Sequence, residues 1–361
     1  MLLLLFAFQI NATPPSASNK LIQIAILLDT SNSMDGLIDQ AKAQLWNIAN
    51  EITNAKRDGK DVRFEFSLYE YGNDNIPAYQ QHVRQITPFT EDMDLISSHL
   101  FALKTKGGEE YCGQVIHNSI SELEWHKEAG LKAIYIAGNE SFAQGQYPYS
   151  ISCKEAKDKN IKINTIFCGD YNQGISLQWN NGSSLTYGTY NHINQNSETI
   201  HIDSPYDDEI SLLNKRLNET YISYTSQGKK NKENQIAQDS NAGSYSRANF
   251  AKRAIYKSKS NYKNVSWDLI DANDAGKDVY KYNNQLPENL KSASKTELLN
   301  KIDELKRLRV SIQENIACLA KEREAYILKA KQEKNISNPF EASIISSLRD
   351  QLAAAGFYVK K

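Results

Sequence analysis

Asp29, Ser31 and Ser33 are the residues of this chain whose types and spacing best fit metal chemistry. At alternating positions of a turn, one carboxylate and two hydroxyls fall on the same side of the loop. Hard divalent cations such as Mg²⁺ and Mn²⁺ prefer oxygen ligands and keep open positions for water or a partner's carboxylate. The residues predict such a site, and the alternative is an ordinary turn in which Asp29 caps and the hydroxyls bind backbone.

A strand and a helix position this turn. Residues 21–28 form a nearly continuous apolar run, which is typical of a strand buried on both faces. An amphipathic helix is expected from about residue 36 to residue 57. Open α/β sheets bind ligands beyond the carboxyl ends of their strands, so the turn lies where a site is expected.

The strand followed by Asp29-x-Ser31-x-Ser33 resembles the metal-ion-dependent adhesion site (MIDAS) of von Willebrand factor type A (VWA) domains. The resemblance covers about residues 20–225 and implies a Rossmann-like, doubly wound, mostly parallel sheet flanked by helices. It also implies three metal-binding loops. The second loop usually supplies a Thr after Gly-Gly, and the third supplies an Asp at the end of the fourth strand.

Two of these loops depart from the family pattern, so the MIDAS is degenerate. Glu109 stands where the Thr would follow Gly107-Gly108, and Gly138 replaces the expected Asp before Asn139 and Glu140. A second carboxylate from Glu109 would restore two negative charges around a Mg²⁺ or Mn²⁺ ion. We therefore predict that the metal ligands are Asp29, Ser31, Ser33 and Glu109, with Glu110, Asn139, Glu140 and Asp170 in supporting positions. The alternative for the two glutamates is a charged helix N-terminus.

The remaining pattern alternates strands with helices. Further strands are expected at about residues 62–71, 82–86, 131–137, 161–167 and 189–193, with Pro88 ending the second of these. Such alternation predicts a mostly parallel sheet with helices on both faces, as the VWA resemblance implies. The α/β domain would span residues 20–225 and end with a helix that begins near Pro205.

The C-terminal part reads as a smaller, all-α region. Residues 226–245 are polar and predict a linker, followed by helices in residues 246–361. Within residues 294–331, apolar side chains recur at heptad spacing, with Arg309 in one slot. This seam would pair with neighbouring helices of the same chain or form an intermolecular coiled coil. Fewer than four full heptads favour the intramolecular arrangement.

The N-terminus and the cysteines bear on localisation. Residues 1–19 contain an apolar run that suits a signal peptide although a basic start is missing, and we expect an exported protein, periplasmic, secreted or on the cell surface. Export would allow a disulfide among Cys112, Cys153 and Cys168, with the pair left open and free buried thiols as the alternative. Frequent Lys, Asn and Ile lean toward a bacterial source.

Composition and the absence of known catalytic motifs limit the classes of function to consider. The net charge of −1 gives no sign of a nucleic-acid binder. The sequence contains no P-loop, HExxH or GxSxG motif. We therefore expect a non-enzymatic module that binds a protein partner, with a cation bridging to the partner's carboxylate. The alternatives are a metal-free assembly protein that interacts through its helices and, less favoured, a metal-dependent hydrolase.

Overall fold

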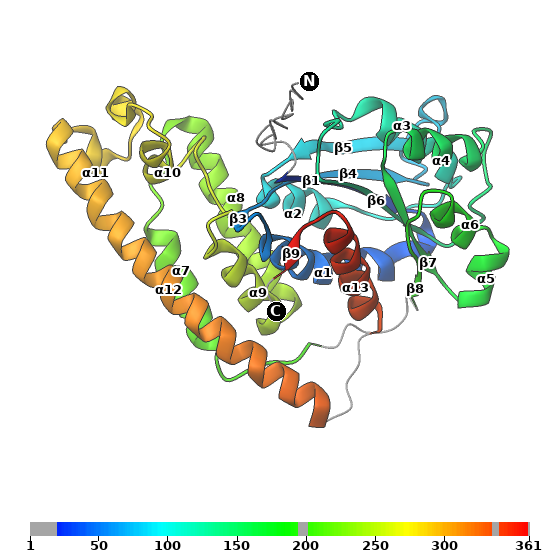
Figure 1. The fold of residues 1–361 in the computed structure, drawn as a ribbon. Helices are drawn as coiled ribbons and strands as arrows, with labels where there is room; N and C mark the ends of the chain where they lie inside the picture. The colour runs from blue at the N-terminus through cyan, green and yellow to red at the C-terminus, as the bar shows by residue number, and fades with distance from the viewer. Residues whose placement is uncertain (1–19, 194–200, 334–338, 360–361) are drawn as a thin grey trace, which may run out of the picture.

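A six-stranded sheet in the order β5-β4-β1-β6-β7-β8 forms the centre of the α/β unit (Figure 1). The computed structural model describes residues 20–193, 201–333 and 339–359. The strands of this sheet are β1 (Leu21–Asp29), β4 (Arg63–Tyr71), β5 (Val83–Thr90), β6 (Leu131–Gly138), β7 (Lys162–Cys168) and β8 (Tyr190–Ile193). All neighbouring strands pair in parallel except β4 and β5, which are antiparallel. The predicted doubly wound, mostly parallel sheet is confirmed.

The chain builds this sheet outward in both directions from β1. It first adds β4 and β5 on one side of β1 and then crosses to place β6, β7 and β8 on the other. The reversal leaves a crevice at the carboxyl end of β1, where loops from both halves meet. Asp29 is the last residue of β1 and lies at this point.

Helices cover both faces of the sheet because side chains alternate along β1. Ile22, Ile24 and Leu28 enter one apolar core, while Ala25 and Leu27 enter the other. The first core includes side chains of α1 (Asp35–Thr53) and α2 (Met93–Ala102). The second lies under α3 (Cys112–Glu122), α4 (Tyr149–Asp158) and α6 (Trp179–Ser184), beside the short α5 (Tyr171–Ser176).

The C-terminal helix α13 (Pro339–Ala354) completes the first face, which corrects the expected domain boundary. Ile344, Leu348 and Leu352 belong to the same apolar core as the strands and α1. The chain then adds β9 (Tyr358–Val359) to a hairpin of β2 (Ala55–Arg57) and β3 (Lys60–Asp61). The α/β unit therefore consists of residues 20–193 together with residues 339–359, not of residues 20–225.

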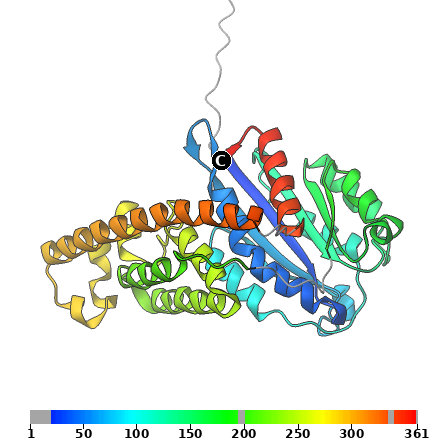
Figure 2. The same cartoon turned by 90° about the horizontal axis from the view of Figure 1, so that it is seen from below.

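A helical arm, residues 207–333, lies between these two parts in sequence and extends away from the sheet (Figure 2). Its helices are α7 (Asp207–Glu219), α8 (Thr225–Tyr245), α9 (Arg247–Lys257), α10 (Leu269–Asp274), α11 (Glu288–Lys291) and the long α12 (Lys295–Glu333), with a 3₁₀ segment at Val279–Gln285. Thus α7 belongs to the arm, where it packs between α9 and α12. The expected all-α region is present, but it begins earlier and ends before α13.

The linker predicted at residues 226–245 is wrong, because this segment forms the helix α8. Its buried face is polar: Gln235, Gln238 and Asp239 lie against neighbouring helices and are hydrogen-bonded there. A polar stripe of this kind gives no apolar periodicity to detect. The end predicted for β5 is also wrong, since the strand continues through Pro88 to Thr90. An edge strand with an irregular register tolerates proline.

Candidate functional site

The loop after β1 brings together the carboxylate and hydroxyls of the DxSxS motif. Asp29 is buried, and its Oδ1 accepts a hydrogen bond from the Ser31 backbone N–H at 2.7 Å. The Oγ atoms of Ser31 and Ser33 lie 3.4 Å apart. Neither hydroxyl caps the 3₁₀ turn at Asn32–Met34 that leads into α1. The Asp29 part of the ordinary-turn alternative is present, whereas Ser33 Oγ accepts from Asn139 Nδ2 and Ser31 lies within hydrogen-bonding range of Asp29 and Glu110.

The second loop, residues 103–111, docks directly on the first. The Lys106 backbone N–H donates to the Thr30 carbonyl at 2.9 Å, and the Gly107 N–H donates to Asn32 Oδ1 at 2.8 Å. Gly108 must be glycine, because a β-carbon there would lie 2.5 Å from the Gly72 carbonyl oxygen. These contacts fix which glutamate of the loop turns toward the site.

The structure brings Glu110, not Glu109, against Asp29. Glu110 is 6% exposed and lies within hydrogen-bonding range of Asp29 and Ser31. Glu109 is exposed and accepts a hydrogen bond from Gln144 Nε2 at 3.0 Å. Adjacent residues of an extended segment point in opposite directions, so only one of the two can face inward. The carboxylate assigned to Glu109 from the sequence is therefore reassigned to Glu110.

The third loop follows β6 and closes the site from the other side. Asn139 Nδ2 donates to Ser33 Oγ at 3.0 Å. Gly138 has no side chain because the space is filled: a β-carbon there would lie 2.5 Å from Tyr71 Oη and 3.2 Å from Asp29 Oδ2. Tyr71 is fully buried and donates to the Ala137 carbonyl at 2.9 Å. The Tyr71 hydroxyl thus occupies the space that a side chain at position 138 would need.

The buried carboxyl groups of Asp29 and Glu110 both have raised pKa values. Burial raises the pKa of Asp29 well above its ordinary range, and the nearby Glu140 adds to the effect. Burial and the charge of Asp29 raise the pKa of Glu110 in the same direction. Asp29 Oδ2, Glu110 Oε2 and Asn139 Oδ1 are buried without a hydrogen-bond donor among the described residues. A buried acceptor that lacks a donor is stabilised by a proton or a cation beside it.

These residues fit a hard dication better than a softer ion that prefers nitrogen or sulfur ligands. Two carboxylates, two hydroxyls and an amide oxygen supply only oxygen, which suits Mg²⁺ or Mn²⁺. Within the described ranges, no three His, Cys, Asp or Glu side chains gather closely enough to hold a metal ion. A cation at this place would therefore depend on the serine hydroxyls as well as on Asp29 and Glu110.

The arrangement agrees with the resemblance noted in the sequence: a doubly wound sheet with three loops meeting at the carboxyl end of β1. The α/β unit has a VWA-like fold. No protein-family model matches the sequence, and no curated protein matches it either. The similarities found are to solved structures, at identities that concern the fold alone.

Three of these structures illustrate the range of VWA-like proteins found. BatB from Bacteroides thetaiotaomicron is 15% identical, with 48% of this chain and 90% of that chain covered and a TM-score of 0.37. The SpRpn10 VWA domain is 16% identical, with 48% and 88% covered and a TM-score of 0.37. Proximal thread matrix protein 1 from the mussel byssus, with a zinc-occupied MIDAS motif, is 12% identical, with 50% and 43% covered and a TM-score of 0.37.

Other predicted residues of the VWA-like unit lie outside the site. Asp170 is exposed and caps α5, accepting from the Asn172 and Gln173 backbone N–H groups at 2.9 and 3.1 Å. Because Asp170 caps α5, its position is explained without any role in binding a ligand.

The disulfide among Cys112, Cys153 and Cys168 is not formed, and all three are separate buried thiols. Cys112 Sγ points to Tyr71 Oη at 3.7 Å, whereas Cys153 Sγ points to the Gly182 carbonyl at 3.5 Å. The thiols sit on different elements and face different partners, so burial at the sheet's edge does not bring them together.

Sequence reasoning missed two aromatic residues that shape the site. Tyr71 ends β4 and fills the space beside Gly138, while Trp179 Nε1 donates to the Glu140 carbonyl at 2.7 Å and fixes the third loop. The alternation of β4 marks Tyr71 as inward-facing, and that was the only signal available.

Proposed function

We propose that this chain is a non-enzymatic, exported interaction module that binds an acidic side chain of a partner protein through a divalent cation. The observation that supports the cation is that the neighbouring carboxyl groups of Asp29 and Glu110 each keep a buried oxygen, Oδ2 and Oε2, without a donor among the described residues. The hydroxyls of Ser31 and Ser33 lie 3.4 Å apart in the same loop as Asp29. The partner's identity is left open. Among the helices of the described ranges, none has the length and apolar character needed to cross a membrane.

Each group of the proposed site has a distinct role. Asp29 and Glu110 would provide the negative charge, and Ser31 and Ser33 would provide neutral oxygens. Asn139 already holds the Ser33 hydroxyl in place through its 3.0 Å hydrogen bond. A Mg²⁺ or Mn²⁺ ion would supply a positive charge with open coordination positions, and a carboxylate of the partner is the ligand that suits them.

Titration of the purified protein with MnCl₂ and MgCl₂ tests the cation at pH 8. We expect saturable heat for the wild type, none for Asp29→Ala, and at least about tenfold weaker binding for Glu110→Gln, because one of the two charged ligands is lost. Glu109→Gln is the matched control: its side chain is exposed, so affinity should change less than about twofold.

The partner part of the proposal requires a second measurement. Binding to acidic peptides immobilised on a surface should need Mn²⁺ or Mg²⁺ and should be reversed by a chelator. If the wild type shows neither heat nor a thermal shift at millimolar cation, the cation is excluded. The chain would then be a metal-free assembly protein that keeps the VWA-like fold. Turnover in a phosphoesterase or esterase screen that disappears with Asp29→Ala would instead indicate a hydrolase.

A further inference from the structure

The two principal loops of the site are each continuous with a helix on the same face of the sheet. The DxSxS loop leads directly into α1, which begins at Asp35. The second loop is the continuation of α2, which ends at Ala102. Thr105 Oγ1 of the second loop donates to Asp35 Oδ1 at the start of α1. The packing of α1 against α2 therefore affects how the two loops meet, while β1 and α3 hold their other ends.

The helical arm packs against α1 through side chains and backbone of α9. The Trp46 ring lies 5.4 Å from the ring of Tyr256 on α9, and the Arg253 guanidinium stacks 4.6 Å from the Trp46 ring. Asn50 Nδ2 donates to the Lys252 carbonyl at 2.8 Å. Because Trp46 and Arg253 are 0% and 1% exposed, this contact is part of the core and not a loose surface contact.

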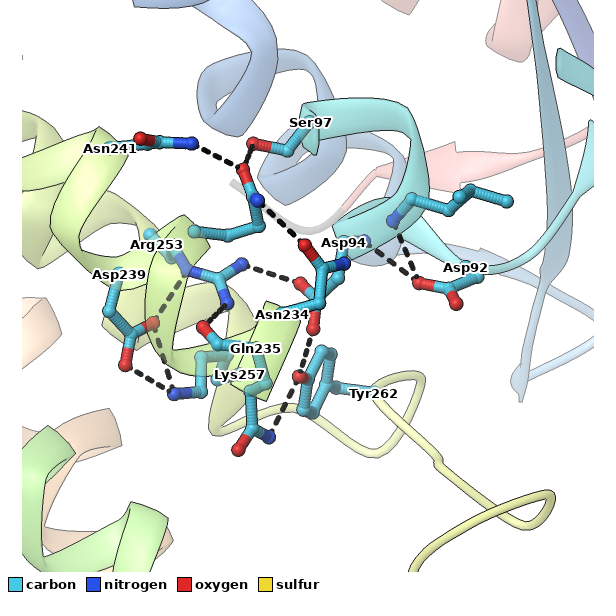
Figure 3. A network of polar contacts seen from close by, with 12 residues as sticks. Asp92, Asp94, Ser97, Asn234, Gln235, Asp239, Asn241, Arg253, Lys257 and Tyr262 are labelled. Carbon is cyan, nitrogen blue, oxygen red and sulfur yellow. Dashed lines mark hydrogen bonds and ion pairs between the residues drawn. The ribbon is translucent and has the colours of Figure 1, made fainter. Parts of the chain in front are cut away.

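A buried polar network fixes the arm to α2 as well (Figure 3). Arg253 donates from Nη1 to Asp94 Oδ1 at 2.7 Å and from Nε to Asp239 Oδ1 at 2.6 Å. Tyr262 Oη donates to the other oxygen of Asp94 at 2.6 Å, and Lys257 Nζ donates to Asp239 Oδ2 at 2.9 Å. Charges this deeply buried hold their partners in one geometry, since separating them would leave an uncompensated charge.

Tyr245, at the C-terminal end of α8, reaches the ends of both helices that adjoin the site. Its Oη donates to Asp39 Oδ1 in the second turn of α1 at 2.6 Å. Its ring meets Phe101 in the last turn of α2 edge-on, with ring centroids 5.6 Å apart. Tyr245 is half-buried and lies outside the charged network, so it can be changed without leaving a buried charge unpaired.

We infer that the helical arm holds the two loops of the cation site in register through Tyr245 and the Asp94–Arg253–Asp239 network. Tyr245 is a positioning residue: it acts on Asp29 and Glu110 through α1 and α2 and does not touch them. This inference rests on the proposed cation site for its function. The ordering of the loops by the arm is a property of the chain itself and can be measured without any metal.

Hydrogen exchange of the metal-free protein, read by NMR or by peptide mass spectrometry, tests the ordering. The reporters are the amides of Lys106 and Gly107, which donate to Thr30 O and Asn32 Oδ1. In Tyr245→Ala we expect their protection to fall about tenfold, a coupling in the usual range between sites. Tyr245→Phe keeps the ring but loses the bond to Asp39, and an intermediate change is expected.

The matched control is Tyr282→Ala. Tyr282 is also half-buried in the arm, but its ring packs 4.6 Å from Tyr224, among the residues near α10 and α11. It should lower thermal stability without changing the exchange of the two reporter amides. Equal loss of protection in both variants, or none in Tyr245→Ala, would overturn the inference.

Manganese titration of the same variants separates this inference from the proposed function. If both hold, Tyr245→Ala weakens Mn²⁺ binding roughly tenfold and Tyr282→Ala does not. If the wild type binds no Mn²⁺ while Tyr245→Ala still loosens the loops, the cation fails and the positioning stands. If Mn²⁺ binds the wild type and Tyr245→Ala equally well and the loops stay protected, the positioning fails alone.

Discussion

Asp29 and Glu110 are two buried carboxyl groups within hydrogen-bonding range of each other, and burial raises the pKa of both. The Tyr71 hydroxyl fills the space beside Gly138, where the resemblance to VWA domains predicts an aspartate. The second carboxylate therefore comes from the loop after α2. Because charge and oxygen count matter more to a hard dication than the loop that supplies them, the exchange is chemically reasonable.

The raised pKa values predict how stability depends on pH without cations. In the unfolded chain, the carboxyl groups of Asp and Glu titrate at about pH 4. Above that, the folded protein binds more protons than the unfolded chain, because burial raises the pKa of Asp29 and Glu110. The free energy of unfolding should therefore fall as pH rises from about 4 through neutrality.

Glu110→Gln should flatten that dependence and raise the free energy of unfolding at pH 8 by about 1 to 3 kcal/mol. Urea unfolding at several pH values, in the presence of a chelator, measures both effects. Glu109→Gln, with its side chain in solvent, serves as the control. A Glu110→Gln curve parallel to the wild type would show that the pair does not share a buried charge.

Among the elements, α12 shows how the heptad seam is used. Its buried positions include Leu298, Ile302, Ile312 and Ile316, together with two arginines 14 residues apart, Arg309 and Arg323. Arg309 Nη2 donates to the Thr220 carbonyl just after α7, at 2.9 Å, while Arg323 Nε donates to Asp207 at the start of α7, at 2.7 Å. The arginines thus bind α7 at both ends, and α12 runs antiparallel to it.

Arg323→Met tests how much the buried contact between Arg323 and Asp207 contributes to stability. It leaves Asp207, which is 0% exposed, without its cation, so we expect a loss of about 3 to 5 kcal/mol in the free energy of unfolding. Arg307→Met on the same helix is the control, because Arg307 is exposed and should change stability by less than about 0.5 kcal/mol. Chemical unfolding followed by circular dichroism measures both. Similar losses of the free energy of unfolding in the two variants would contradict a stabilising role for the Arg323–Asp207 contact.

At the scale of the whole molecule, the C-terminal segment of residues 339–359 completes the α/β unit. The helical arm leaves after the sixth strand of the sheet, and α13 returns to cover it. The seam of α12 faces the chain's own helices, so its buried positions are not free for an intermolecular coiled coil. The intramolecular arrangement favoured by the short heptad run is the one found, with α12 packed mainly on α7 and also on α9 and α10.

A chain ending at residue 333 should lose cooperative unfolding. It lacks Ile344, Leu348, Leu352 and Phe357, which are 0 to 5% exposed in the core of the sheet. Burial of four such side chains contributes about 6 to 12 kcal/mol, comparable with the whole stability of a typical domain. Calorimetry and binding of a hydrophobic dye measure the loss.

Leu348→Ala in the full chain provides the graded comparison. It should cost about 2 to 5 kcal/mol and leave a cooperative transition at lower temperature. A shortened chain that melts as sharply as the full one would mean that α13 is dispensable for the fold.

The sequence by itself determined the central strands and the DxSxS turn. Apolar runs and the residues that end them are local patterns, and burial of the strands on both faces leaves them few alternatives. Only the tertiary structure decided that Glu110 and not Glu109 meets Asp29, that α8 is a helix with a polar buried face, and that α13 closes the sheet. Each of these depends on contacts between residues far apart in the chain, which no local window of sequence contains.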